Sequence, residues 1–288
     1  AKALQGAKPA QRTFDNTGCI CTPTRVCRLD GVHVIGERIN PTGKKRFQQA
    51  LREGDMAYLQ NEGVQQQEKG VHVLDVNVGL PDIDEKAMLV AAVQELQAVL
   101  DLPLQIDSAN AEAMEAALRC YNGKAMINSV NGKESSMAAV FPLVKKYGGV
   151  VVALTLDENG IPVDAKGRVD IAKKILNTAE KYGIEKKNII FDTLAMTVSA
   201  DHTAGLATLQ ALKEIREGLH CHTSLGVSNV SFGLPCRDAL NGVFFALALE
   251  NGLSAAIMNP HSGEMMKTYH TYLALKGLDE NCAGYIQA

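Results

Sequence analysis

The sequence predicts a (β/α)8 barrel, the TIM-barrel form of the α/β class, and three observations support this prediction. Eight short apolar runs recur along the chain, amphipathic stretches of helical period separate them, and successive runs begin about 32 residues apart. This spacing fits eight repeats in a barrel of about 250 residues. The alternative, a doubly wound open sheet, usually has fewer strands and a glycine-rich phosphate turn after the first. The first turn here, ERINPTGKKR, contains one glycine, so the barrel is preferred.

The predicted elements follow one another in the same order along the chain. Buried parallel strands are expected at the apolar runs, and the helices between them are clearest at residues 84–100 and 169–182. The predicted strands cover residues 32–39, 71–79, 102–107, 124–130, 149–156, 188–194, 222–230 and 253–259.

The first 30 residues differ from the rest of the chain in composition and in hydrophobic periodicity. They contain Pro9, Pro23 and many glutamines and threonines, with no sustained period of either helix or strand. We therefore predict an irregular N-terminal arm or inter-domain linker over residues 1–30 and a single barrel domain over residues 31–288. Because the chain begins with alanine, it is interpreted as a piece of a longer protein.

The composition excludes several classes of protein. The chain has 288 residues, with 29 Lys and Arg against 32 Asp and Glu, and 46% of its residues are apolar. The net charge of −3 argues against nucleic acid or an anionic membrane as the main partner, and no apolar run approaches the roughly 18 residues of a membrane span. Seven cysteines without a dense framework favour reduced thiols. A soluble, cytoplasmic protein is therefore expected.

Polar side chains end all eight predicted strands, and in a barrel these ends surround the active site. The alternative for any one such residue is that it caps the following helix. Capping is the weaker explanation where the residue is embedded in its apolar run, because a buried polar side chain needs a partner and a ligand would supply one. The embedded residues are Asp75, Asn77, Asp107, Asn128, Asp192 and Asn229, and the other strand-end candidates include Glu37, Asn40 and Ser228.

The residue types at the strand ends exclude several kinds of catalysis and favour one class of ligand. The strand ends have no Lys, Cys or Ser–His pair, which argues against covalent catalysis, and no three converging His or Cys, which argues against a catalytic zinc. No metal is therefore expected in this chain. Carboxylates and amides suit a flat, polar heterocycle, because a carboxylate accepts two parallel hydrogen bonds and an amide both donates and accepts.

Seven motifs carry a resemblance to a known family. They fall in order, one per predicted strand except the fifth, and the resemblance extends over residues 31–288. The motifs are GERINPTGKKRF (36–47), LDVNVGLP (74–81), QIDSAN (105–110), INSVNG (127–132), FDTLAM (191–196), LGVSNVSFGLPCR (225–237) and AAIMNP (255–260). The sequence resembles the pterin-binding methyltransferases, most closely the methyltetrahydrofolate-binding domain of cobalamin-dependent methionine synthases. The resemblance implies a barrel like that of dihydropteroate synthase, a more distant relative.

The resemblance also implies a reaction and a set of site residues. The reaction is transfer of a methyl group from 5-methyltetrahydrofolate to cob(I)alamin, which a separate corrinoid domain carries. Asn229 would approach nitrogen 5 of the pterin, and Asp75 and Asp107 would share the stabilisation of positive charge there. Thr193 stands where the family usually has proline, which predicts a looser loop after Asp192. The residues implied to bind substrate are Asp75, Asn77, Asp107, Asn128, Asp192, Gly226, Ser228, Asn229 and Arg237, together with Glu37 and Asn40 at the same mouth.

Partner domains and alternative functions follow from what the sequence lacks. Neither the corrinoid motif D-x-H-x-x-G nor the paired cysteines of a homocysteine-binding zinc domain occurs, so we expect a separate corrinoid domain and a preceding homocysteine-binding domain. Two alternatives are a methyltransferase acting on a corrinoid iron–sulfur protein and a folate-binding barrel without turnover. Pteroate synthesis is disfavoured, because GVSNVS lacks the lysine and NPHS lacks the Arg–His pair of that enzyme class. Lys44, Lys45 and Arg46 are predicted to form a solvated basic turn, and the alternative is that they contact the folate glutamate tail or the corrinoid partner.

Overall fold

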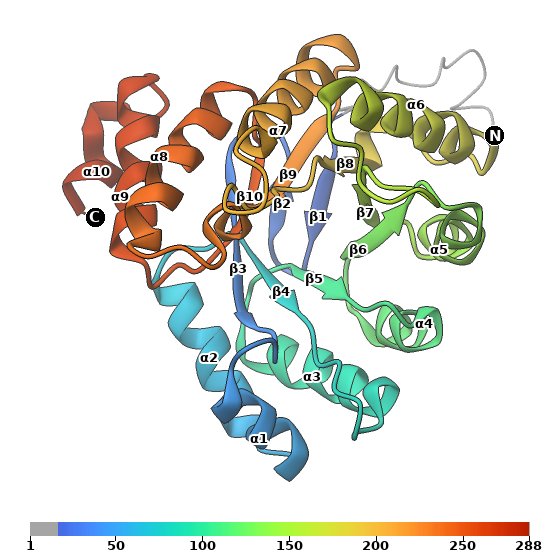
Figure 1. The fold of residues 1–288 in the computed structure, drawn as a ribbon. Coiled ribbons are helices and arrows are strands. Elements are labelled where there is room, and N and C mark those ends of the chain that lie inside the picture. Colours follow the sequence, from blue (N-terminus) through green and yellow to red (C-terminus); the bar gives the residue numbers. More distant parts are fainter. Residues whose placement is uncertain (1–16, 288) are drawn as a thin grey trace, which may run out of the picture.

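The computed structural model describes residues 17–287, and it contains the predicted barrel. Eight parallel strands close on themselves in the order β10-β3-β4-β5-β6-β7-β8-β9, and helices surround them (Figure 1). Each of the eight predicted runs holds one strand, so this prediction is confirmed. The strands are β3 (His33–Ile39), β4 (Val73–Val76), β5 (Leu104–Asp107), β6 (Met126–Asn131), β7 (Val150–Leu154), β8 (Ile189–Asp192), β9 (His222–Gly226) and β10 (Ala255–Met258).

Helices connect the strands and cover the outside of the barrel. Two of them, α1 and α2, lie between β3 and β4, and the predicted helices at 84–100 and 169–182 correspond to α3 and α6. No helix in the described part of the chain is long and apolar enough to cross a membrane. The helices are α1 (Lys45–Glu53), α2 (Met56–Glu68), α3 (Glu85–Val99), α4 (Ala111–Cys120), α5 (Glu134–Tyr147), α6 (Ala165–Lys181), α7 (Ala204–Lys213), α8 (Arg237–Glu250), α9 (Gly263–Leu275) and α10 (Ala283–Gln287).

Several helices begin at a side chain that accepts a hydrogen bond from a backbone N–H of the first turn. The capping residues are Asp55, Asp84, Asn110, Asp164 and Ser262. Such caps satisfy donors that have no partner within the helix. All of them lie in the loops, beyond the strand ends. The predicted site residues do not cap these helices, and helix capping does not explain their positions.

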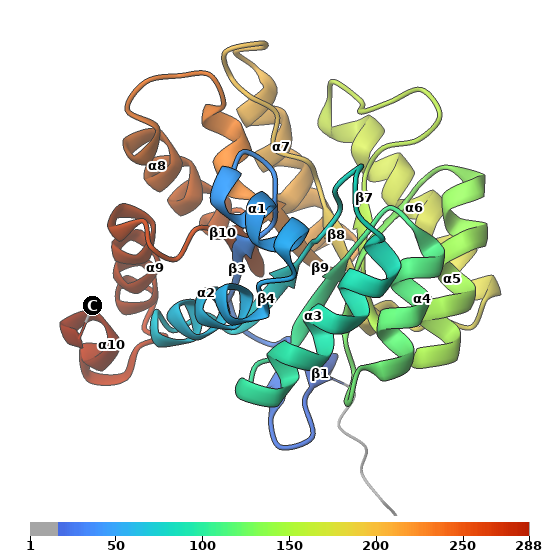
Figure 2. The ribbon, with the colours of Figure 1, turned by 90° about the horizontal axis from the view of Figure 1, so that it is seen from below.

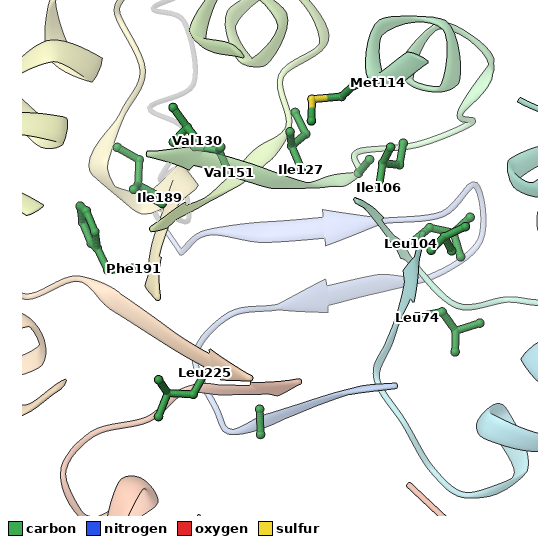
Figure 3. Close-up of a cluster of buried hydrophobic side chains, with 14 of the residues drawn as sticks. Leu74, Leu104, Ile106, Met114, Ile127, Val130, Val151, Ile189, Phe191 and Leu225 are labelled. Atoms are coloured by element: carbon green, nitrogen blue, oxygen red, sulfur yellow. The ribbon is translucent and has the colours of Figure 1, made fainter. Parts of the chain in front are cut away.

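The strands alternate between residues that face the helices and residues that face the barrel interior. Figure 3 shows outward-facing residues such as Leu74, Ile106 and Phe191, which belong to the main apolar cluster between strands and helices. Val73 and Ile190, one position earlier than Leu74 and Phe191, belong to a second cluster inside the barrel. Toward the C-terminal strand ends the interior positions become polar, and this change creates the site described below.

A β-hairpin, β1 (Cys19–Cys21) with β2 (Val26–Arg28), lies within the segment predicted to be an irregular arm. Ile20, Cys27 and Leu29 are buried in the interior cluster, and the hairpin lies across the barrel end formed by the starts of the strands (Figures 2 and 3). The prediction of an irregular arm is therefore wrong for these two strands, because three-residue strands are too short to show a period. Residues 1–16 lie outside the described part of the chain.

The hairpin is expected to stabilise the barrel by filling its lower end. Ile20 is fully buried, so Ile20→Ala should lower the free energy of unfolding by about 2–5 kcal/mol, because it removes apolar contacts and leaves a cavity. Val26, on the same hairpin, is 65% exposed, and Val26→Ala should change stability by only about 0.5 kcal/mol. Urea unfolding of both variants tests this. Equal, small effects would mean that the hairpin contributes nothing to the barrel core.

Candidate functional site

A cavity of about 430 Å³ opens among the C-terminal ends of the strands. It brings together the predicted site residues, with the exception of Asn77. This position agrees with the general location of active sites in barrels of this type. The cavity is lined by Glu37, Asn40, Thr42, Lys44, Asp75, Asp107, Asn128, Leu154, Asp192, Leu194, Ala195, Gly226, Ser228, Asn229, Arg237 and Ile257.

Two carboxyl groups from neighbouring strands form one wall of this cavity. Asp75 on β4 is buried, and its Oδ1 accepts a hydrogen bond of 2.6 Å from Nε2 of Gln105 on β5. Asp107, two residues beyond Gln105, accepts a bond of 3.0 Å at Oδ2 from Nδ2 of Asn77. Asn77 therefore touches a carboxylate of the cavity rather than lining the cavity itself. Gln105 was not predicted from the sequence, because a glutamine in a strand carries no specific signal.

Burial changes the acidity of these carboxyl groups. The loss of hydration and the neighbouring charge of Asp107 raise the pKa of Asp75 well above its ordinary value. Burial also raises the pKa of Asp107 to about 6, against the opposing hydrogen bond from Asn77. Burial raises the pKa of Glu37, which lies on β3 at the same mouth. Burial therefore shifts these carboxyl groups toward their protonated forms, and a protonated carboxyl donates a hydrogen bond as well as accepting one.

Asp192 forms another part of the cavity, at the end of β8. Its carboxyl accepts a 2.7 Å hydrogen bond from the backbone N–H of Leu194 and lies 3.5 Å from the hydroxyl oxygen of Ser224 on β9. Burial raises the pKa of Asp192 to about 6, although these donors oppose the effect. Leu194 has a positive φ of 62°, and with Ala195 it turns the chain along the cavity edge.

The segment after β9 places an amide and an arginine at the mouth. Asn229 lies in a 3-10 turn, η4 (Val227–Ser231), and its side chain makes no hydrogen bond to a described residue. A Cβ on Gly226 would lie 2.9 Å from Nδ2 of Asn229, so glycine leaves room for this amide. Arg237 donates from Nε to the Ser231 hydroxyl at 2.9 Å and from Nη2 to the Ser228 carbonyl at 2.7 Å. The Asn229 side chain therefore remains available to a ligand.

Lys44 corrects one expectation from the sequence. It is half-buried, lines the cavity, and donates from Nζ to the backbone carbonyls of Glu37 at 2.9 Å and Asn40 at 3.1 Å. Burial lowers its pKa. The turn was predicted to be solvated because its three consecutive basic residues gave no sign of which side chain would fold back. The apolar part of the lining was also not predicted from the sequence, and it comprises Leu154, Leu194, Ala195 and Ile257.

The described residues contain no group of three or more His, Cys, Asp or Glu side chains arranged to hold a metal ion. The polar groups of the cavity are carboxyls, amides, two hydroxyls and two cations, set against a small apolar surface. Such a lining can orient an organic molecule by hydrogen bonds at its edges while its faces rest on apolar side chains.

A comparison with known families places the chain in one of them. Residues 36–259 match the family described as pterin-binding enzymes, and the chain therefore belongs to that family. Among curated proteins, methionine synthase of Mycobacterium tuberculosis is 34% identical over 241 residues, which cover 79% of this chain and 20% of that protein. The methylcorrinoid:tetrahydrofolate methyltransferase of Eubacterium limosum is 30% identical over 263 residues, covering 88% of this chain and 95% of that protein.

Solved structures show the same barrel at lower sequence identity. Dihydropteroate synthase from Stenotrophomonas maltophilia superposes with a TM-score of 0.68 at 20% identity, covering 91% of this chain and 99% of that one. The enzyme from Xanthomonas albilineans with 4-aminobenzoic acid gives a TM-score of 0.69 at 18% identity. The predicted likeness to the dihydropteroate synthase barrel is therefore confirmed at the level of the fold. The Eubacterium limosum relative is a methyltransferase by name, and the match to methionine synthase spans about one fifth of the length of the mycobacterial protein.

The raised pKa of Asp192 predicts a pH-dependent stability. The folded pKa of about 6 exceeds the ordinary 3.8, so the contribution of this group is fully present below about pH 4 and is lost as pH rises through 6. Asp192→Asn should therefore gain about 1–3 kcal/mol relative to the native chain between acid and neutral pH. Urea unfolding at both pH values measures the change.

Asp201 provides the matched control for this measurement. It is exposed, and the N–H and hydroxyl of Thr203 lower its pKa, so Asp201→Asn should show no such gain at neutral pH. A pH-independent difference between Asp192→Asn and the native chain would contradict the assignment of a buried, easily protonated carboxyl.

Proposed function

We propose that this chain binds 5-methyltetrahydrofolate and transfers its methyl group to cob(I)alamin carried by a separate corrinoid domain or protein. The observation that carries the proposal is the convergence of Asp107, Asn128 and Asp192 on one cavity at the barrel mouth. Their carboxyl and amide groups match the donors and acceptors along the edge of a pterin ring. Membership of the pterin-binding family and the names of the methyltransferase relatives support the same assignment.

Recognition of the pterin is assigned to polar groups for the edge of the ring and apolar side chains for its faces. Asp192 and Asn128 would accept hydrogen bonds from the amino and ring N–H groups, since a carboxylate accepts two parallel bonds. Leu154 and Ile257 lie in the same lining and would contact the faces of the ring. This division gives both orientation and affinity, because buried donors of the ligand must be paired.

Catalysis requires charge on nitrogen 5 to be stabilised. A tertiary amine leaves poorly until it is protonated or strongly hydrogen-bonded, so groups that interact better with the charged nitrogen accelerate the transfer. Asn229 would accept a hydrogen bond from the protonated nitrogen through Oδ1. Asp75 and Asp107, whose pKa values are raised by burial, would share the stabilisation of this charge. The corrinoid supplies a nucleophilic cobalt that takes the methyl group in line with the departing nitrogen.

A second candidate is the reverse transfer, from a methylcorrinoid to tetrahydrofolate. One observation favours it: the chain covers 95% of the length of the Eubacterium limosum methylcorrinoid:tetrahydrofolate methyltransferase. The same cavity would serve both directions, because the transition state is shared. The preceding homocysteine-binding domain belongs to the methionine synthase form of the proposal. The alternative partner, a corrinoid iron–sulfur protein, belongs to the form of the proposal in which this domain is not joined to other domains of a larger protein.

A spectroscopic assay tests the proposed function directly. The chain is mixed with 5-methyltetrahydrofolate and cob(I)alamin, and methylcobalamin formation is followed by its absorbance. The reverse mixture, methylcobalamin with tetrahydrofolate, tests the second candidate. Binding of the folate without transfer in either direction would leave a folate-binding barrel without turnover, and absence of binding would overturn the proposal.

Removing a pterin-facing carboxylate should weaken folate binding. Asp107→Ala and Asp192→Ala each leave ligand N–H groups unpaired, so each should cost about 1–3 kcal/mol of binding free energy. Calorimetry with 5-methyltetrahydrofolate measures the loss. Asp170→Ala, at an exposed position on α6, serves as the control and should bind normally. Unchanged affinity in both site variants, with the fold intact, would move the pterin site elsewhere.

Asn229→Ala should reduce turnover more than affinity. Loss of a group that acts mainly in the transition state typically costs ~10²–10³ in rate, equivalent to ~2.7–4 kcal/mol. Stopped-flow methyl transfer at saturating folate measures the rate, and a melting curve checks the fold. Asn177→Ala, on the exposed surface of α6, should react at the native rate. A stable Asn229→Ala protein slowed less than a few-fold would remove this amide from the mechanism.

A further inference from the structure

Arg168 is the largest fully buried side chain in the described part of the protein, and it lies outside the cavity. It belongs to the first turn of α6 and is 1% exposed. Its Nε donates to the carbonyl of Pro162 at 3.0 Å. Its Nη1 lies 2.7 Å from the carbonyl of Thr193, 3.0 Å from that of Leu194 and 2.9 Å from the hydroxyl of Thr208.

This arginine forms no salt bridge with a described residue, since its hydrogen-bond partners are three carbonyls and one hydroxyl. Withdrawing a guanidinium group from water without an adjacent carboxylate is costly. The carboxylates whose charges act on it are Asp192 and Asp164. A buried charge in this place therefore has an electrostatic effect on the site as well as a packing role.

Two of the three carbonyls that Arg168 binds belong to Thr193 and Leu194, the residues that directly follow Asp192. The backbone N–H of Leu194 donates to Asp192 Oδ1 at 2.7 Å, while its carbonyl accepts from Arg168. Leu194 has a positive φ, and the neighbouring Thr193 is fully buried with no partner for its hydroxyl. Thr193 replaces the proline that the sequence pattern led us to expect, and a looser loop was predicted. The guanidinium of Arg168 instead holds this segment through hydrogen bonds to the carbonyls of Thr193 and Leu194.

We infer that Arg168 is a positioning residue for the proposed pterin site, holding residues 193–194 so that Asp192 presents its carboxylate to the ligand in one orientation. The inference rests on the proposed folate binding. Burial raises the pKa of Asp192, and the positive charge of Arg168 opposes this effect together with the hydrogen bonds from Leu194, Ser224 and Gly226. Asp192 would then be mainly ionised at neutral pH, and the ionised carboxylate can accept two parallel hydrogen bonds from pterin N–H groups.

The test measures 5-methyltetrahydrofolate binding by calorimetry across a pH series in Arg168→Met and Arg168→Lys. Arg168→Met removes both the charge and the hydrogen bonds, so affinity should fall about tenfold or more near neutral pH. The pH at which binding is half lost should move upward, because Asp192 loses its stabilising charge. Arg168→Lys keeps the charge but not the planar fork, so its pH midpoint should stay near native while affinity falls less.

A double-mutant cycle with Asp192→Asn separates positioning from general stability. If Arg168 acts through Asp192, Arg168→Met should change folate affinity less than about twofold in the Asp192→Asn background. Arg119→Met, at an exposed arginine of α4, controls for loss of a positive charge and should bind normally. Melting curves accompany each variant, so loss of folded protein is not counted as loss of affinity.

The outcomes distinguish this inference from the function on which it rests. No binding by the native chain would overturn the proposed function and the inference with it. Native binding with a folded Arg168→Met protein of unchanged affinity and pH midpoint would overturn the inference alone, as would fully additive effects in the cycle. If Arg168→Met does not fold, Arg168→Lys decides, and native affinity in that variant would also overturn the inference.

Discussion

Three carboxyl groups, Asp75, Asp107 and Asp192, lie inside the barrel at positions where water is largely excluded. Each ionised carboxylate in such a place needs donors, and much of the surrounding structure supplies them. An amide donates to each of the first two, and a backbone N–H donates to the third. The site is therefore a balance between desolvation, which favours the protonated acid, and a limited number of fixed donors that favour the anion.

The same constraint explains how the barrel interior is divided. Inward-facing residues near the strand starts, such as Val73 and Ile190, pack with the hairpin and exclude water. Two positions further along the same strands stand Asp75 and Asp192, on the same inner face. Because the apolar residues near the strand starts exclude water, an unpaired polar side chain just above them costs more free energy than it would in water. A ligand that offers matching polar edges thus gains more here than it would at the protein surface.

Much of this architecture could be predicted from the sequence, because strand periodicity is local. A buried strand with one polar residue near its end, such as IIFD at β8, indicates both the strand and the inward side chain. Arg168 could not be found in this way, since its partners are mainly backbone carbonyls brought together by tertiary folding. The hairpin was missed because its strands are three residues long. Lys44 folds back onto carbonyls that the sequence does not reveal as neighbours.

The hairpin across the lower end has a kinetic consequence. With that end filled, both substrates of the proposed reaction approach through the mouth formed by the strand ends. In the proposed reaction the folate would enter before a corrinoid protein docks, and it would leave only after that protein departs. Turnover would then follow an ordered sequence, and excess corrinoid partner bound to an empty barrel would delay folate entry. Access to the cavity from one end alone would thereby set the order of events in the proposed reaction.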